Sequence, residues 1–225
     1  MPRSTPLKPR KAPQQPRSQQ TVAALLEAAA QVLETRGMAG FNTNAVALRA
    51  GVSIGSLYQY FPSKESLTLA LVQREGERFA AEAQTALAEE SGPAALQVLI
   101  VAAVRQQLRR PELARLLDIE EARPELRDAV KKGAFRALLA EVLSRADMPR
   151  QRDHGLAVND VGAVIRGIVD GAGERGETDE AGLQRRVEAA VFGYLCGAAI
   201  NPTVNTEVNP QVSPAISPES ESGTR

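Results

Sequence analysis

Apolar residues recur three and four positions apart through most of the chain, which is the spacing that places them on one face of an α-helix. The first such segment runs from Ser18 to Arg36 and stops before Gly37, a residue type that often closes helices. No segment shows the strict alternation typical of a half-buried strand. The predicted fold class is therefore all-α. Nine helices are expected, at about residues 18–36, 43–50, 54–61, 64–90, 94–109, 112–121, 124–146, 158–174 and 179–198.

The prolines indicate where this helical part begins and ends. Nine of the fourteen lie in two end segments, and the other five stand between helical segments, as helix boundaries do. Because Pro-rich ends with few apolar residues cannot join a core, residues 1–16 and 201–225 are predicted to be disordered tails, the first of them basic. Residues 17–63 then form a small N-terminal domain and residues 64–200 a larger helical domain.

Two short helices with a three-residue connection stand out in the first domain. Gly51 follows the first of these helices, and Ser53 precedes the second. Glycine accepts the positive φ that ends a helix tightly, and a serine oxygen caps the free N–H groups of the next helix. Two short helices joined in this way form a helix-turn-helix, in which the second helix enters the major groove of DNA.

The second short helix has two different faces. Leu57 and Phe61 are four residues apart and are expected to face inward. The opposite side and its flanks carry Gly55, Ser56, Tyr58, Gln59 and Tyr60. An amide can pair with a base edge, and hydroxyl groups can bind phosphates, so this face suits the major groove. A helical hairpin buried in a larger core would instead need apolar residues on this side.

Lys64 lies in the first turn of the following helix, where the helix dipole disfavours a cation. A lysine is favourable there if a phosphate meets both its ammonium group and the free N–H groups of the helix end. A plain exposed lysine is the alternative.

Charge is balanced overall but unevenly distributed along the chain. Residues 1–64 hold eight basic and two acidic residues, a net charge of +6, and the remainder carries −6. A neutral protein with a basic first third is expected to have a localised surface that binds polyanions.

The rare residue types limit the chemistry. Cys196 is the single cysteine and His154 the single histidine, which excludes an internal disulfide and leaves no histidine-rich metal site. A nucleophilic enzyme would have to use His154, which lies in a polar stretch and is expected to be a solvated loop residue. We expect no enzyme activity, no cofactor and no metal. The chain has no apolar run of membrane-spanning length, so a cytoplasmic location is expected.

The run FNTNAVALRAGVSIGSLYQYFPSKESL, from Phe41 to Leu67, resembles the DNA-binding segment of TetR-family transcriptional regulators. The helix before it, with LLEAA at residues 25–29, shares this resemblance. The pattern AGVS-G-LY-YF-SKE-L is specific to the family, and the resemblance covers about residues 17–67. The remaining chain is similar only in length and helical layout. The resemblance implies a helix-turn-helix domain followed by a larger domain that binds a small molecule and dimerises.

Carried over onto matching positions, the resemblance also implies which residues contact DNA. Thr43 and Asn44 are expected to meet DNA at the start of the first short helix. The residues expected at or near bases are Ser53, Ile54, Gly55, Ser56 and Gln59. Those expected on the DNA backbone are Tyr58, Tyr60 and Lys64. By its apolar character, Ile54 could equally stabilise the turn or touch a thymine methyl group.

The larger domain gives weaker indications of its effector site and dimer interface. The residues expected near an effector are Phe79, Arg105, Leu116, Glu120, Phe135, Leu139 and Arg166. With few aromatic residues, an apolar or amphipathic effector, aliphatic or acyl, is favoured. The apolar stripes expected to form a homodimer are Val161, Ile165, Ile168, Val187, Val191, Tyr194 and Leu195. The alternative is that these stripes pack against their own subunit.

The sequence therefore predicts a transcriptional regulator, a ligand-responsive repressor that binds a palindromic DNA operator as a homodimer. One alternative is a ligand-independent or architectural DNA-binding protein, against which the size of the second domain argues. The other is an all-α enzyme, which would need a convergent acid and base that the sequence does not offer.

Overall fold

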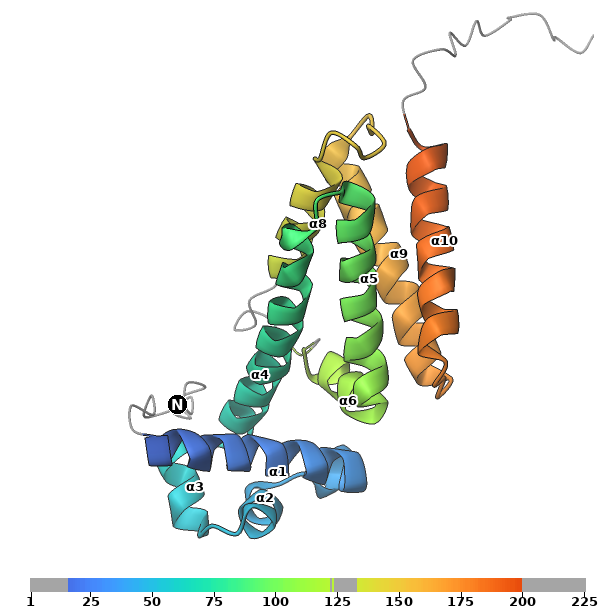
Figure 1. Cartoon of the computed structure of the whole chain (residues 1–225). Helices are drawn as coiled ribbons and strands as arrows, with labels where there is room; N and C mark the ends of the chain where they lie inside the picture. The colour runs from blue at the N-terminus through green and yellow to red at the C-terminus, as the bar shows by residue number, and fades with distance from the viewer. Residues whose placement is uncertain (1–15, 122, 124–132, 200–225) are drawn as a thin grey trace, which may run out of the picture.

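The computed structural model describes residues 16–121, 123 and 133–199, and the regular structure of this part is helical (Figure 1). The elements are α1 (Pro16–Gly40), α2 (Thr43–Ala50), α3 (Ile54–Tyr60), α4 (Lys64–Gln84), the 3₁₀ helix η1 (Thr85–Ala88), α5 (Gly92–Arg109), α6 (Pro111–Glu121), α8 (Ala134–Leu143), α9 (His154–Glu174) and α10 (Glu180–Gly197). The all-α fold class is thus confirmed. None of these described helices is both long enough and apolar enough to cross a membrane.

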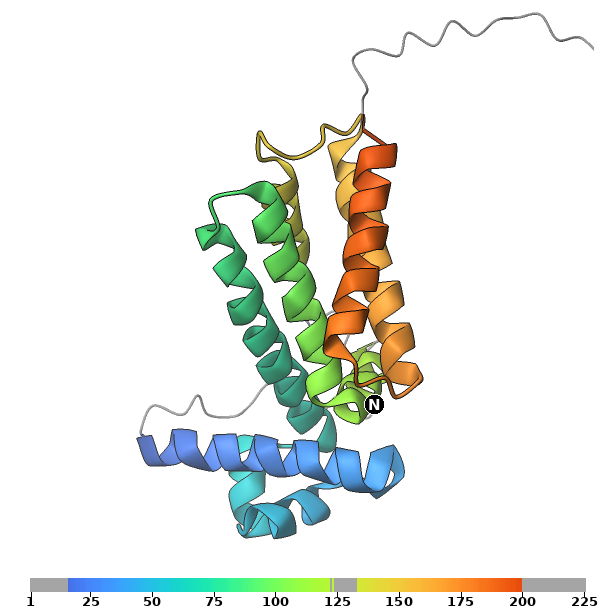
Figure 2. The ribbon, with the colours of Figure 1, turned by 45° about the vertical axis from the view of Figure 1, so that its right-hand side comes forward.

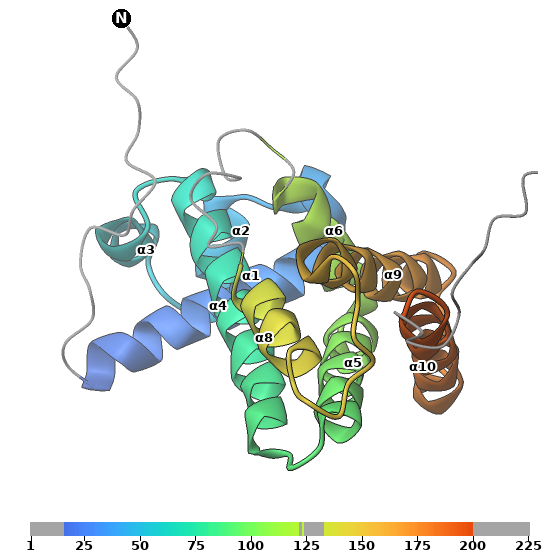
Figure 3. The same ribbon diagram turned by 90° about the horizontal axis from the view of Figure 1, so that it is seen from above.

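The helices form a base and an upright bundle (Figures 1 and 2). α1 lies across the base, with α2 and α3 on the side away from the bundle. α4 rises from this base and contacts α5 and α8, while α9 packs between α8, α5 and α10. Seen from above, α9 and α10 form the edge of the bundle that lies opposite α4 (Figure 3). The helix-turn-helix is therefore at one end of the molecule.

Backbone and side-chain caps define the two short helices. The Asn42 side chain accepts a hydrogen bond from the backbone N–H of Ala45 at 2.9 Å, which begins α2. Gly51 closes α2 in the left-handed region, with φ 68° and ψ 27°. The Ser53 hydroxyl then accepts from the backbone N–H of Ser56 at 3.0 Å and begins α3. The turn chemistry predicted for Gly51 and Ser53 is confirmed.

The largest differences from the expected helix boundaries in the larger domain are at the end of α4 and at the start of α9. α4 ends at Gln84 and continues only as η1, whereas one helix to residue 90 was expected. α9 begins at His154, four residues before the expected start, because the Asp153 side chain caps the Leu156 amide at 2.9 Å. The first three residues of α9, 154–156, are exposed, so the periodic burial of apolar residues begins only at Ala157.

Some expectations fall outside the described residues. The helix expected at 124–146 is described only from α8 onward. The tails expected at 1–16 and 201–225 also lie outside, apart from Pro16, which begins α1.

Two apolar clusters hold the helices together. The bundle core joins the C-terminal part of α4 and η1 to α5, α8, α9 and α10. The second cluster, which we call the N-terminal core, joins α1, α2 and α3 to the first half of α4 and to α6. Its buried members are Leu25, Leu26, Ala28, Ala29, Ala30, Val32, Leu33, Phe41, Val46, Ala47, Leu57, Phe61, Leu67, Leu71, Val72, Leu113, Leu116 and Leu117. The packing of the N-terminal domain thus continues beyond residue 63.

The left-handed backbone at Gly51 predicts that the same substitution has different effects at two nearby glycines. In Gly51→Ala the added methyl group meets no atom within 4 Å, so the cost is conformational, about 1 kcal/mol of unfolding free energy. Gly55→Ala lies in the helical backbone of α3 and is expected to be neutral, or to stabilise by less than about 1 kcal/mol. Denaturant unfolding of both full-length variants measures the difference. Equal effects would contradict the role of Gly51.

Candidate nucleic-acid interface

The ten residues expected to contact DNA all lie on α2, the turn, α3 or the first residue of α4, at the base of the molecule (Figure 1). Six of them are exposed, namely Asn44, Ser53, Ile54, Gly55, Tyr58 and Gln59. The other four are half-buried, namely Thr43, Ser56, Tyr60 and Lys64. The structure therefore brings the expected residues together, and it separates a solvent-facing group from a group that also contacts protein.

The outward side of α3 is set by burial of its inward side. Leu57 is fully buried, whereas Tyr58 is 44% exposed and Ile54 is 37% exposed. The Tyr58 hydroxyl lies 3.1 Å from the Thr43 hydroxyl, within hydrogen-bonding distance. This contact joins the start of α2 to the middle of α3, so the two hydroxyl groups are presented as a pair.

Tyr60 does not share the outward face expected for it. Its side chain is half-buried and packs against the N-terminal core. Tyr60 follows the buried Leu57 by three residues, and residues three apart lie on the same side of a helix. Ser56 is also partly committed to protein, because its hydroxyl lies 2.8 Å from that of the cap residue of α3. The open face of α3 is therefore centred on Tyr58 and Gln59.

Lys64 is the first residue of α4 and is half-buried. Its ammonium nitrogen lies 5.3 Å from the centroid of the buried Phe41 ring, a cation–π contact. Ser63 and Ser66 form a capping box at this helix end. The Phe41 ring thus holds a positive charge next to the N-terminus of α4, where the helix dipole also favours an anion.

One polar contact of the helix-turn-helix was not expected from the sequence. The Arg49 guanidinium, in the last turn of α2, donates to the Gln31 amide oxygen of α1 at 2.8 Å. A basic residue in a last helical turn is visible in a sequence, but its partner is 18 residues away and depends on how α1 crosses α2.

Two of the residues expected near an effector lie together between α4 and α8, and a third is buried in the bundle core against which they pack. Phe79 and Phe135 have ring centroids 5.0 Å apart. Both rings are half-buried and pack against the bundle core, of which the buried Leu139 is a member. These residues are the apolar part of the expected effector site that the fold does assemble.

Three other residues of the expected effector set lie elsewhere. Leu116 is buried in the N-terminal core, where it packs with α1 rather than with the bundle. Glu120 is 6% exposed and pairs with Arg123 at 3.0 Å near the end of α6. Arg166 is exposed on α9.

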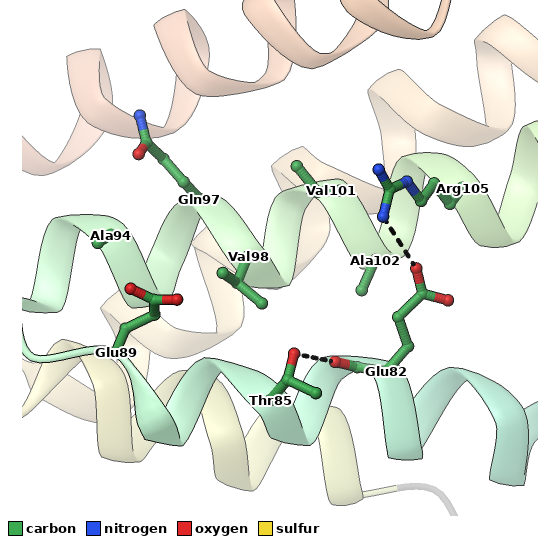
Figure 4. A pocket seen from close by; sticks show the side chains of 9 residues that line it. All are labelled: Glu82, Thr85, Glu89, Ala94, Gln97, Val98, Val101, Ala102 and Arg105. Carbon is green, nitrogen blue, oxygen red and sulfur yellow. Dashed lines mark hydrogen bonds and ion pairs between the residues drawn. The ribbon is translucent and has the colours of Figure 1, made fainter.

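Arg105, the last residue of the expected effector set, lies in an open groove between α4 and α5 (Figure 4). The volume of this groove is about 410 Å³. Arg105 donates to Glu180 of α10 at 2.9 Å and lies 3.6 Å from Glu82 of α4. The hydrogen bond to Glu180 raises the pKa of Arg105. Since its charge is matched by two carboxylates, Arg105 is part of an inter-helix ion pair, separate from the Phe79 and Phe135 rings.

The structure contradicts most of the dimer interface that was expected from the apolar stripes of α9 and α10. Five of the seven residues are buried in the bundle core of the single chain, namely Val161, Ile165, Val187, Val191 and Leu195. Their side chains pack against their own subunit, so they cannot form a partner surface. Ile168 and Tyr194 are half-buried, and the Tyr194 hydroxyl donates to Asp160 at 2.7 Å, which raises the pKa of Tyr194.

The solvent-facing sides of α9 and α10 carry small residues in place of these stripes. Ala163 and Gly167 are exposed four residues apart on α9. Ala189 and Gly193 are exposed four residues apart on α10. Such positions allow close approach of another helix.

Comparison with known proteins agrees with this geometry. Residues 25–71 match the family model of bacterial regulatory proteins, tetR family. The N-terminal domain of this chain therefore matches the DNA-binding domain of the TetR family. Two uncharacterized HTH-type transcriptional regulators of Mycobacterium tuberculosis are 36% identical to this chain over 91 residues. The match covers 40% of this chain and 45% of each relative, so it spans less than half the length of these relatives.

Solved structures extend the likeness to the larger domain. The fatty acid degradation regulator FadR from Bacillus halodurans superposes with a TM-score of 0.70 at 22% identity, over 82% of this chain and 98% of that one. FadR from Bacillus subtilis, solved in complex with stearoyl-CoA, gives a TM-score of 0.66 at 18% identity, over 75% of this chain and 96% of that one. At these identities the likeness shows only that this chain shares their fold.

Proposed function

We propose that this protein is a sequence-specific DNA-binding regulator of the TetR family that represses transcription by occupying a palindromic operator as a homodimer. The observation that carries the proposal is the open face of α3, where Tyr58 and Gln59 are exposed and Lys64 stands at the adjacent N-terminus of α4. The match of residues 25–71 to the tetR family model supports the same function. A repressor that acts by occupying DNA needs no reaction chemistry. Because its target is DNA, its proposed location is the cytoplasm.

The proposed contacts divide into two kinds. Gln59 is the residue able to pair with a base edge in the major groove, since a side-chain amide offers both a donor and an acceptor. The Thr43 and Tyr58 hydroxyls and the Lys64 ammonium are suited to phosphate oxygens, which hold the protein in register without reading sequence. The base pairs read by α3 would therefore be separated, along each half-site, from the phosphates that anchor it.

Dimerisation is proposed to use the exposed sides of α9 and α10. Four helices, two from each subunit, would meet across a two-fold axis, with Ala163, Gly167, Ala189 and Gly193 allowing close approach. α9 and α10 form one edge of the bundle, so pairing there leaves α3 of both subunits free at the base (Figure 3). A two-fold dimer presents two copies of α3, which is why a palindrome is expected.

The proposed effector is an apolar or amphipathic small molecule that binds between α4 and α8. The half-buried Phe79 and Phe135 rings give this region an apolar surface above the bundle core, of which Leu139 is a buried member. The stearoyl-CoA bound by the Bacillus subtilis neighbour is a molecule of this chemical class. α4 begins beside the helix-turn-helix, so a ligand that favours one position of α4 over another would alter DNA affinity.

Two substitutions are expected to separate base reading from phosphate anchoring. Gln59→Ala should cost about 1–3 kcal/mol on the operator and much less on a duplex altered at the base it reads. Lys64→Ala should weaken binding to all duplexes alike and reduce the slope of log affinity against log salt by about 0.9, because one phosphate is no longer neutralised. Titrations of operator and scrambled DNA at several salt concentrations measure both. Identical profiles for the two variants would contradict this division.

A charge on the outer side of α10 is expected to disrupt the dimer. Ala189→Glu would place two carboxylates at the two-fold interface, where unpaired charges are costly, and should shift the protein to monomer at micromolar concentration. Ala81→Glu, at an exposed position on α4, is the matched control and should leave the dimer intact. Sedimentation equilibrium measures both variants, and circular dichroism checks that each is folded. A dimeric Ala189→Glu protein would place the interface elsewhere.

The effector site is tested by thermal unfolding with a panel of fatty acids and acyl-CoA thioesters. A panel member present at one hundred times its dissociation constant should stabilise the wild type by about 2.7 kcal/mol. Phe135→Ala should remove most of this gain, whereas Phe192→Ala, at a half-buried position on α10, should not. If no panel member stabilises the wild type, the proposed effector class is wrong. If both variants lose the gain equally, the site is not between α4 and α8.

A further inference from the structure

A single residue separates α5 from α6, and its side chain reaches back to the base of the molecule. α5 ends at Arg109 and α6 begins at Pro111, so Arg110 forms the corner between them. Its guanidinium donates to both carboxylate oxygens of Glu34 on α1, at 2.6 and 2.5 Å. It also donates to Glu27 of α1, at 3.1 and 3.2 Å. One guanidinium therefore binds two carboxylates that lie two turns apart on one face of α1.

Further polar contacts extend this cluster in two directions. The Glu27 carboxylate accepts from Gln31 at 3.3 Å, and Gln31 in turn accepts from Arg49 of α2 at 2.8 Å. Glu27 also pairs with Arg74 of α4 at 3.3 Å. A continuous series of side-chain contacts thus runs from the corner of α5 and α6, across α1, to the helix-turn-helix and to α4.

The charges in this cluster are partly buried. The exposed fractions of the Arg110 and Glu34 side chains are 21% and 25%. Partial burial acts to raise the pKa of Glu27, but the charge of Arg110 and the hydrogen bonds from Gln31 and Arg110 outweigh it, so this pKa is lowered. The hydrogen bonds to Glu34 raise the pKa of Arg110. Glu27 and Arg110 therefore stabilise the ionised forms of one another.

Apolar packing and ion pairs contribute differently to the contact between α1 and the corner of α5 and α6, which we call the joint. Leu113, Leu116 and Leu117 of α6 pack in the N-terminal core, but the hydrophobic effect that holds aliphatic side chains together is non-directional. A guanidinium that binds a carboxylate through two parallel hydrogen bonds has a defined geometry. Of the contacts at the joint, those of Arg110 are therefore the ones that define the orientation of α1 relative to the bundle.

We infer that Arg110 is a positioning residue that fixes the orientation of α1, and with it α3, relative to the bundle, and so determines which operator spacing the dimer accepts. The inference rests on the proposed function. The helical backbone of α1 is interrupted at Gly37 (φ 61°, ψ −170°), so its continuous part, residues 16–36, is about 31 Å long. α3 lies beneath the first half of α1, and α6 lies above its second half (Figures 1 and 2). A rotation of about 10° over about 20 Å moves α3 by about 3.5 Å, which is the rise of one base pair.

The test compares operators that differ in spacing alone. The probe is the palindromic duplex that the wild type selects from a random-sequence library, together with versions in which one central base pair is inserted or removed. Fluorescence anisotropy gives the ratio of affinities for the selected and altered spacings. In Arg110→Gln this ratio should fall by about fivefold or more, the lower end of typical coupling between two sites. Arg110→Lys should show a similar fall, since an ammonium group cannot form the bidentate contact.

The matched control is Arg115→Gln. Arg115 pairs with Glu112 in an exposed contact within α6 at 2.7 Å, so this variant removes the same charge five residues away and should keep the wild-type ratio. If Arg110→Gln fails to fold, Glu34→Gln removes the bidentate partner while leaving the Arg110 to Glu27 contact, and it should show the same fall. Folded Arg110 or Glu34 variants with an unchanged ratio would overturn the inference, as would an equal fall in Arg115→Gln. If the wild type selects no palindrome, it is the proposed function that fails.

Discussion

α1 is packed on both sides, and the other interactions of the base depend on this packing. Below it, α2 and α3 bury Val46 and Leu57 in the N-terminal core, and above it the first half of α4 and the leucines of α6 close the same cluster. A fully buried leucine contributes about 1.5–3 kcal/mol, so α6 is bound firmly to the N-terminal domain although the chain reaches it after α5. α6 packs on α1 of the base and also on α9 and α5 of the bundle, so base and bundle meet at α6 and at the corner formed by Arg110.

This packing explains how a neutral protein can present a surface for a polyanion. The two acidic residues among the first 64, Glu27 and Glu34, are both held by arginines at the joint with α6, away from the open face of α3. Tyr58, Gln59 and Lys64 are thus presented without a neighbouring carboxylate from this segment. The acidic excess lies in the remaining chain, and within it Glu65 is exposed next to Lys64 in the first turn of α4.

Local signals predicted the helix-turn-helix almost residue by residue. The positive φ of Gly51 and the cap at Ser53 involve atoms a few residues apart, so their identities alone indicate the backbone. The outward orientation predicted for Tyr60 from the same local reasoning is wrong. In a helix of seven residues, one step along the sequence turns a side chain by about 100°, and the core decided that Tyr60 packs inward while Gln59 stays exposed.

The sequence by itself determined the all-α fold, the turn between α2 and α3, and the family of the N-terminal domain, because helical periodicity, glycine conformation and capping are local properties. Only the tertiary structure decided what the apolar stripes pack against. It placed Val161 and Val187 in the subunit's own core and Leu116 against α1. Glu34 and Arg110 are 76 residues apart, and no local pattern predicts that they meet. A stripe shows that a helix has a buried face, but the partner depends on how distant helices cross.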